Sequence, residues 1–196
     1  NVLLGSFAGA EITSGAYNSA VGHNAGGGGS GSAATGNYNS ALGYASLQNT
    51  TSASNNVAVG GFSMQVNTTG RENIAVGYQT LDANLTGNRN AASLQVTTTG
   101  YNNVGVGASS LQQNTEGYAN VSIGYQAMTL TTTGVNNVAV GENALRTNVD
   151  DHGSVAVGYR SLYSANNTAS AGYVYNIAMG FQSGYSVSTG KENILI

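Results

Sequence analysis

The chain has 196 residues, and only 7% of them are charged, against the ~25% of ordinary soluble domains. It contains 29 glycines and no cysteine, proline or tryptophan, so a disulfide framework is excluded. The net charge is −3 with no cluster of basic residues, and we therefore expect no nucleic-acid partner. No apolar run approaches the ~18 residues that a membrane-spanning helix needs, so we expect no membrane insertion of this segment.

A five-residue motif, Asn-(Val/Ile)-Ala-(Val/Ile/Leu)-Gly, recurs from one end of the chain to the other. Eight of the eleven intervals between successive copies are 17 residues long, and the other three are 13, 21 and 22. A fixed period is the signature of a repeat architecture, whereas a disordered chain has no reason to repeat valines at fixed spacing. The first position of the motif falls at Asn1, Asn18, Asn39, Asn56, Asn73, Asn90, Asn103, Asn120, Asn137, Ser154, Asn176 and Asn193.

The length of the period selects the architecture. Seventeen residues are too few for a helical hairpin or a propeller blade, which need roughly 33 or more. Large aliphatic residues alternate with a small one, as in Val138-Ala139-Val140, and this period of two is typical of a β-strand. We expect the large residues to point inward and the small one outward. The sequence therefore predicts an all-β fold, a parallel β-solenoid (β-roll) of about eleven coils of ~17 residues.

Two further features recur in each coil. A polar corner, Thr-Thr-Gly or close to it, follows the strand and has the composition of a turn. Stacking of the coils is expected to bring the motif asparagines into a ladder at one edge. A third apolar position, four residues after the motif glycine, completes the predicted core: Leu47, Met64, Leu81, Leu111, Met128, Leu145 and Leu162.

We predict that residues 1–196 form a single solenoid segment. The chain opens and stops inside a copy of the motif, whereas solenoids end in atypical capping repeats. We therefore expect the segment to be a fragment of a longer fibre protein. The two longest intervals carry extra residues, which predict enlarged surface loops at 23–36 and 159–175.

The small third position of the motif predicts self-association. Three large apolar side chains per coil make a thin core, and exposed strand positions usually carry Thr, Lys or Glu rather than alanine. A ladder of small residues on an outer face suits a close-packed subunit interface. The predicted interface residues are Ala20, Ala41, Ala58, Ala75, Ala139, Ala156 and Ala178.

Aromatic residues follow the motif glycine directly in five coils. We expect them to stack along one edge, where they would either form a platform for sugar rings or cover the ends of the coils. Packing is the favoured interpretation for most of them. The predicted aromatic row consists of Tyr44, Tyr78, Tyr125, Tyr159 and Phe181.

No residue pattern predicts catalysis, a metal site or a cofactor. The run Asp150-Asp151-His152 resembles a metal or acid–base cluster, but it occupies a polar corner and is interpreted as a solvated turn. The glycine-rich run 26–31 lacks the Lys-(Ser/Thr) and the helix of a phosphate-binding loop, so we interpret it as a flexible loop. We expect the chain not to be an enzyme.

The repeat resembles those of two kinds of surface fibre. The core Asn-x-Ala-(Val/Ile)-Gly-x-x-(Ser/Ala) is similar to the head repeats of trimeric autotransporter adhesins, although those coils are typically shorter than 17 residues. The fuller unit at 133–145 is similar to repeats in bacteriophage tail fibres. The resemblance covers essentially the whole chain, and it implies a left-handed β-roll and a homotrimer.

The resemblance and the repeat together predict a non-enzymatic fibre segment. It would act as a rigid spacer and as a host- or surface-attachment module on a virion tail or a bacterial cell surface, outside the cell. Its partners would be further copies of itself and a cell-surface glycan or protein receptor. An ice- or crystal-surface binder is the alternative. A polysaccharide-cleaving solenoid of the tailspike type is a third hypothesis, disfavoured by carboxylates scattered at different corners: Glu72, Glu116, Glu142 and Glu192.

Overall fold

The structure is a computed structural model that describes residues 1–27, 31, 33–92, 96–97, 99–165, 172–187 and 190–196. Within these residues all regular secondary structure is β-strand, and every strand pair is parallel. The predicted all-β parallel solenoid is therefore confirmed. The chain divides into two compact units, Asn1–Thr99 (unit 1) and Gly100–Ile196 (unit 2).

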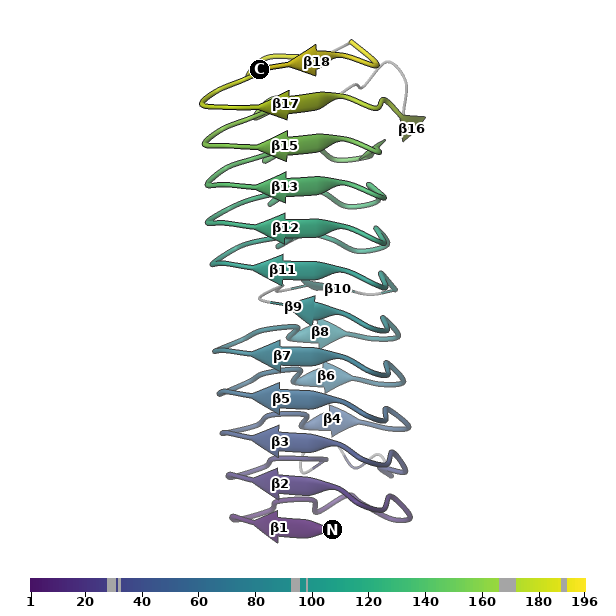
Figure 1. Cartoon of the computed structure of the whole chain (residues 1–196). Coiled ribbons are helices and arrows are strands. Elements are labelled where there is room, and N and C mark those ends of the chain that lie inside the picture. Colours follow the sequence, from purple (N-terminus) through teal and green to yellow (C-terminus); the bar gives the residue numbers. More distant parts are fainter. Residues whose placement is uncertain (28–30, 32, 93–95, 98, 166–171, 188–189) are drawn as a thin grey trace. The chain divides into compact units, whose positions relative to one another are not determined.

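The main sheet of unit 1 contains one strand from each coil (Figure 1). Its register places each motif position beside the same position of the next coil, so that Ala58 pairs with Ala75 and Val59 with Val76. Each step from one strand to the next is therefore one turn of the solenoid. The strands are β1 (Val2–Leu4), β2 (Ser19–Val21), β3 (Ser40–Leu42), β5 (Val57–Val59), β7 (Ile74–Val76) and β9 (Ala91–Ala92).

The main sheet of unit 2 is built in the same way. Val138 pairs with Val155 after 17 residues, and Val155 pairs with Ile177 after 22, so the longer interval keeps the register. The strands are β11 (Val104–Val106), β12 (Val121–Ile123), β13 (Val138–Val140), β15 (Val155–Val157), β17 (Ile177–Met179) and β18 (Ile194–Leu195).

Each unit also has a smaller parallel sheet on another side of its coils. In unit 1 this sheet has the order β10-β8-β6-β4, and in unit 2 it pairs β14 with β16. The unit 1 strands follow the core position, whereas β14 and β16 lie at the polar corner. Their bounds are β4 (Asn49–Thr50), β6 (Val66–Asn67), β8 (Ala83–Asn84), β10 (Val96–Thr97), β14 (Asp151–His152) and β16 (Gly172–Tyr173).

A glycine ends the motif because the next coil leaves no room for a side chain there. Gly60 has a φ of +129°, a conformation that residues with a Cβ rarely adopt. A Cβ at Gly60 would also collide with the carbonyl oxygen of Gly77 in the next coil. The predicted glycine corner is thus confirmed, and close stacking of the coils is its physical reason.

The facing of the main sheets is the reverse of the prediction. Ala58, Ala75 and Ala139 are fully buried, while Ile74 and Val76 are 50% and 61% exposed. The alanine column lies inside the coil and the large aliphatic residues point outward. Because the alanine side chains are covered by the chain itself, the prediction that they form a subunit interface is wrong: Ala20, Ala41, Ala58, Ala75, Ala139, Ala156 and Ala178 are all buried.

The predicted third apolar position is confirmed as the main part of the core. Its leucine and methionine side chains are buried in every one of the seven predicted coils, at 0–1% exposure. The alanine column faces this leucine–methionine column across a narrow interior. At two coils whose core position is glycine, a leucine in the alanine column fills the space: a Cβ at Gly9 would lie 2.7 Å from Leu3, and one at Gly184 would lie 2.7 Å from Leu195. At Gly26, which also holds the core position, the neighbour is Ala20.

The remaining interior is polar, and hydrogen bonds between neighbouring coils join many of its side chains. Ser63 donates to the carbonyl oxygen of Ala75 (3.1 Å), and Ser110 and Ser161 make the equivalent bonds in other coils. A second column of buried asparagines precedes the corner glycine, and sequence reasoning missed it although its spacing is visible. Its members are Asn67, Asn84, Asn114 and Asn148.

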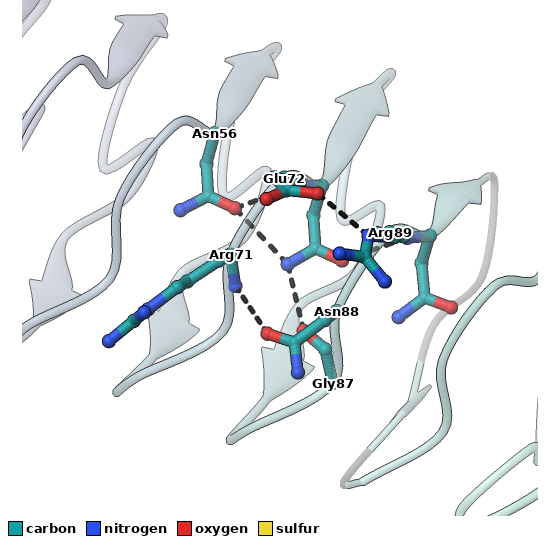
Figure 2. Close-up of polar contacts among 8 residues, drawn as sticks. Asn56, Arg71, Glu72, Gly87, Asn88 and Arg89 are labelled. Atoms are coloured by element: carbon teal, nitrogen blue, oxygen red, sulfur yellow. Dashed lines mark hydrogen bonds and ion pairs between the residues drawn. The ribbon is translucent and has the colours of Figure 1, made fainter.

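The predicted ladder of motif asparagines is present, and most of its members are buried. Figure 2 shows a part of it near Asn56. The side-chain oxygen of Asn56 accepts hydrogen bonds from the backbone N–H (3.0 Å) and the amide (3.1 Å) of Asn73. The amide of Asn73 also donates to the carbonyl oxygen of Gly87 at the next corner (2.8 Å). Each asparagine therefore ties its own coil to both neighbours, and polar groups that would otherwise be buried without partners are satisfied.

The structure covers the two predicted enlarged loops in part. Residues 28–30 and 32 of the loop at 23–36, and residues 166–171 of the loop at 159–175, lie outside the described residues. Of the glycine-rich run 26–31, only Gly26, Gly27 and Gly31 are described. Ile12 forms an isolated parallel bridge with Ala34, so the chain rejoins the stack by that point.

Candidate binding surfaces

The outer side of each main sheet is an aliphatic face. It consists of the second and fourth motif positions of successive coils, and none of these side chains is charged. Uncovered aliphatic surface of this kind marks interaction sites, because soluble proteins rarely expose contiguous apolar patches beyond a few hundred Å². The exposed members are Val2, Leu4, Leu42, Val57, Ile74 and Val76 in unit 1, and Val106, Ile123, Ile177, Met179, Ile194 and Ile196 in unit 2.

The predicted aromatic row forms in parts. In unit 1, Tyr44 and Tyr78 do not touch directly; Phe62 lies between them, with ring centroids 5.0 and 5.9 Å away. The same row continues with His23, whose ring centroid is 5.5 Å from that of Tyr44, and with Phe7, whose ring centroid is 5.8 Å from that of His23. The five-ring row of unit 1 is therefore longer than predicted. It includes His23 and also Phe7 and Phe62, which lie two residues after a motif glycine.

In unit 2 the row is interrupted. Tyr159 stacks on Phe181, with centroids 5.2 Å apart, and the guanidinium of Arg160 lies 5.0 Å from the centroid of Tyr159. Tyr125 and Tyr159 are separated by the intervening coil, which has Glu142 at this position. The edge thus carries one five-ring row and one stacked pair, and its role in binding stays a prediction.

Other tyrosines stack at the corner before the motif asparagine. Tyr101 and Tyr118 lie parallel with centroids 4.7 Å apart, and Tyr17 and Tyr38 do the same at 4.9 Å. Each pair joins two neighbouring coils through aromatic stacking. They support the packing interpretation for tyrosines at this corner.

The corner of unit 2 contains a groove of about 440 Å³ with acidic and aromatic walls. Glu116 and Asp150 occupy the same corner position two coils apart, so at ~4.8 Å per coil their backbones are about 10 Å apart. His152 packs edge-on against Tyr173, and its Nδ1 accepts a hydrogen bond from the backbone of Val135 (3.1 Å). Of the four glutamates that the sequence places at different corners, only Glu116 lines this groove. Together with Asp150 it suits hydrogen bonds to sugar hydroxyls.

The run Asp150-Asp151-His152 is not the uniformly solvated turn that the sequence predicted. Asp151 is 1% exposed and stands where other coils have the corner glycine, whereas Asp150 and His152 line the groove of unit 2. Across the described residues, no group of three or more His, Asp or Glu side chains is placed to hold a metal ion.

The corresponding corner of unit 1 carries arginines where that of unit 2 carries carboxylates. A groove of about 600 Å³ lies between Thr69, Arg71, Glu72, Thr86, Asn88, Arg89 and Thr99. Arg89 Nε forms an ion pair with Glu72 (2.8 Å), and Asn88 accepts a hydrogen bond from the backbone N–H of Arg71 (2.8 Å), as Figure 2 shows. We call these seven residues the arginine groove.

Asp82 is a partly buried carboxyl group. Burial raises the pKa of Asp82 above its ordinary value, because the charged form loses solvation. Its Oδ1 is enclosed and has no hydrogen-bond partner. Asp82 directly follows the core residue Leu81 and lines neither groove, so it bears on stability rather than on binding.

Comparisons with known proteins give no relative. Searches of protein-family models, of curated proteins and of solved structures find no significant match to this chain. No helix long and apolar enough to cross a membrane occurs in the part of the chain that the structure describes.

Proposed function

We propose that this chain is a non-enzymatic fibre segment that assembles with further copies of itself and holds the fibre to a surface. The resemblance to tail-fibre and adhesin repeats points to a homotrimer on a virion tail or a bacterial cell surface. In that setting weak contacts repeated on identical subunits add up as avidity.

The observation that carries the proposal is the aliphatic face. Val76 is 61% exposed, Val106 is 54% exposed, and most coils add at least one further aliphatic side chain to the same side. Ser19 and Ser40 are its exposed polar members. Covering such a side chain completely is worth about 1.5–3 kcal/mol relative to full exposure. Because the face extends over the strands of each main sheet, covering it would contribute a large favourable binding free energy.

A second copy of the chain is the partner that matches this face best. The aliphatic side chains repeat once per coil, and another copy presents the same repeat along the same direction. The absence of charge at these positions favours an equally apolar partner over a charged one. The contact proposed here is the outer aliphatic face, in place of the alanine column.

The solution mass tests the proposal. By light scattering behind a sizing column, we expect three times the 19.7-kDa chain mass. Val106→Glu should lower the mass to that of one chain, because a carboxylate buried in an apolar interface has no partner. Gln113→Glu makes the same addition of charge at an exposed site of the same coil and should leave the trimer intact. A monomeric parent chain, or a trimer that tolerates Val106→Glu, would refute the assembly.

The alternative of an ice-binding face is less well supported. Such a face needs threonine hydroxyls directed to solvent, but several corner threonines donate to carbonyl oxygens of the next coil. Thr51 bonds to Thr68 (2.7 Å) and Thr68 to Leu85 (2.6 Å). These hydroxyls join the coils, and the flat outer face carries aliphatic side chains instead.

A further inference from the structure

The arginine groove concentrates positive charge in a chain that has little of it. Only five residues of the chain are Lys or Arg, and two of them, Arg71 and Arg89, line this groove from adjacent coils. Both side chains are exposed. The aliphatic face carries no charge, so the groove is chemically separate from the proposed self-association surface.

Arg71 presents an unused guanidinium. Within the described residues its side chain makes no hydrogen bond or ion pair, and Figure 2 shows it directed away from Glu72. An exposed arginine changes rotamer within nanoseconds, so the group can turn toward a ligand in the groove at low cost. Its planar fork of N–H donors matches two oxygens of a carboxylate or sulfate.

The neighbouring side chains add further donors. The Oδ1 of Asn88 is occupied by the backbone N–H of Arg71, which leaves the side-chain N–H groups of Asn88 for a ligand. Arg89 binds Glu72 through Nε, so its terminal nitrogens keep their donors. The pair also neutralises the one carboxylate in the groove, and the charge of Arg71 remains unbalanced.

The surroundings favour an acidic sugar over a neutral one. No aromatic side chain lines the groove, so a ring would be held by charge and hydrogen bonds rather than by stacking. The exposed hydroxyls of Thr69 and Thr99 suit the hydroxyl groups of a sugar. At the same corner of unit 2, Glu116 and Asp150 would repel an anion.

We propose that the arginine groove binds the carboxylate or sulfate group of an acidic cell-surface polysaccharide. This proposal rests on the surface-attachment part of the proposed function and is independent of self-association. Arg71 and Asn88 make the direct contacts, and Glu72 positions Arg89.

Titration calorimetry with three oligosaccharides tests it: hyaluronan fragments for carboxylate, heparin fragments for sulfate, and dextran as the neutral sugar. We expect one of the two anionic sugars to bind and dextran not to bind. Arg71→Gln should weaken binding at least tenfold. Asn88→Asp keeps the acceptor for the backbone of Arg71 but replaces the donors with a negative charge, and should abolish binding.

Lys191→Gln is the matched control, because Lys191 stands two residues before Asn193 as Arg71 stands two residues before Asn73. It removes the same charge and should leave the affinity unchanged. Equal losses in Lys191→Gln and Arg71→Gln, or equal binding of dextran, or no binding of either anionic sugar, would overturn the proposal. Light scattering on the same samples reports the assembly separately, so the two proposals fail independently.

Discussion

The motif asparagine makes the contacts that hold one coil to the next. Asn103 is buried, donates to the carbonyl oxygen of Gly117 (2.8 Å), and accepts from the backbone and side chain of Asn120 (3.1 Å each). The residue before it, Asn102, is exposed and has a φ of 56°, a region that asparagine tolerates better than most residues.

This neighbouring pair gives a matched test. Asn103→Asp places a carboxylate against the carbonyl oxygen of Gly117. The hydrogen bond that the Asn103 amide donates is then lost, and a charged group replaces a buried neutral one. We expect the free energy of unfolding to fall by about 2–3 kcal/mol or more. Asn102→Asp, the same chemical change one residue earlier, should alter it by less than about 0.5 kcal/mol. Thermal unfolding followed by circular dichroism measures both, and equal effects would contradict the role of the ladder.

Asp82 is a residue whose environment opposes its charge. The positions equivalent to it in the two preceding coils are Gln48 and Gln65, and Gln65 donates to Gln48 (3.0 Å). Asp82→Gln would extend this row, and one added hydrogen bond contributes about 1 kcal/mol. The variant should therefore unfold at a higher temperature at neutral pH.

The pH dependence of that gain has a defined sign. Because the pKa of Asp82 is raised in the folded chain, the folded state binds more protons than the unfolded one in the range above the ordinary pKa. The destabilisation by the charged carboxyl is complete above the raised pKa and is relieved as the pH falls through it. Part of the stability gained by Asp82→Gln comes from removing the charge, and this part should shrink as the pH falls. A stability gain that grew on acidification would contradict this account.

At the scale of the element, the coil stacked on each short strand determines where that strand ends. Gly60 ends β5 where the carbonyl oxygen of Gly77 lies against it, whereas a Cβ at Gly61 would lie 3.5 Å from the ring of Tyr78. Two adjacent glycines thus differ in the space around them. One is required by stacking, and the other is not.

Gly60→Ala and Gly61→Ala separate these two situations. Gly60→Ala forces a residue with a Cβ into a φ near +129° and into its neighbour, so we expect a loss of about 2–4 kcal/mol. Gly61→Ala should be neutral or stabilising by up to about 1 kcal/mol, because alanine restricts the unfolded chain. Denaturant unfolding gives both values, and a tolerated Gly60→Ala would show that the coils are packed more loosely.

At the scale of the whole molecule, the interior of each unit is thin and largely polar. The leucine–methionine column, the alanine column and a few further alanines and valines supply its apolar part, and buried asparagines and serines supply much of the rest. The larger aliphatic residues are left outside. Covering them with another copy therefore adds the hydrophobic burial that a single chain lacks, which is the physical argument for assembly.

Much of the architecture follows from the sequence alone. The 17-residue period, the strand at each motif, the glycine corner, the asparagine ladder and the leucine–methionine column were all predictable, because each is a local pattern repeated along the chain. Repetition fixes the register as well, since identical positions must stack on one another. The structure confirms these features at named residues, such as Ala58 beside Ala75 and Asn56 bonded to Asn73.

Only the tertiary structure decided which side of each strand faces inward. Alternation of Val138, Ala139 and Val140 defines two faces but does not say which of them is enclosed. The coil is narrow, and the leucine–methionine column occupies most of its interior, so only a small side chain fits opposite. The valines must then lie on the outer side of the sheet.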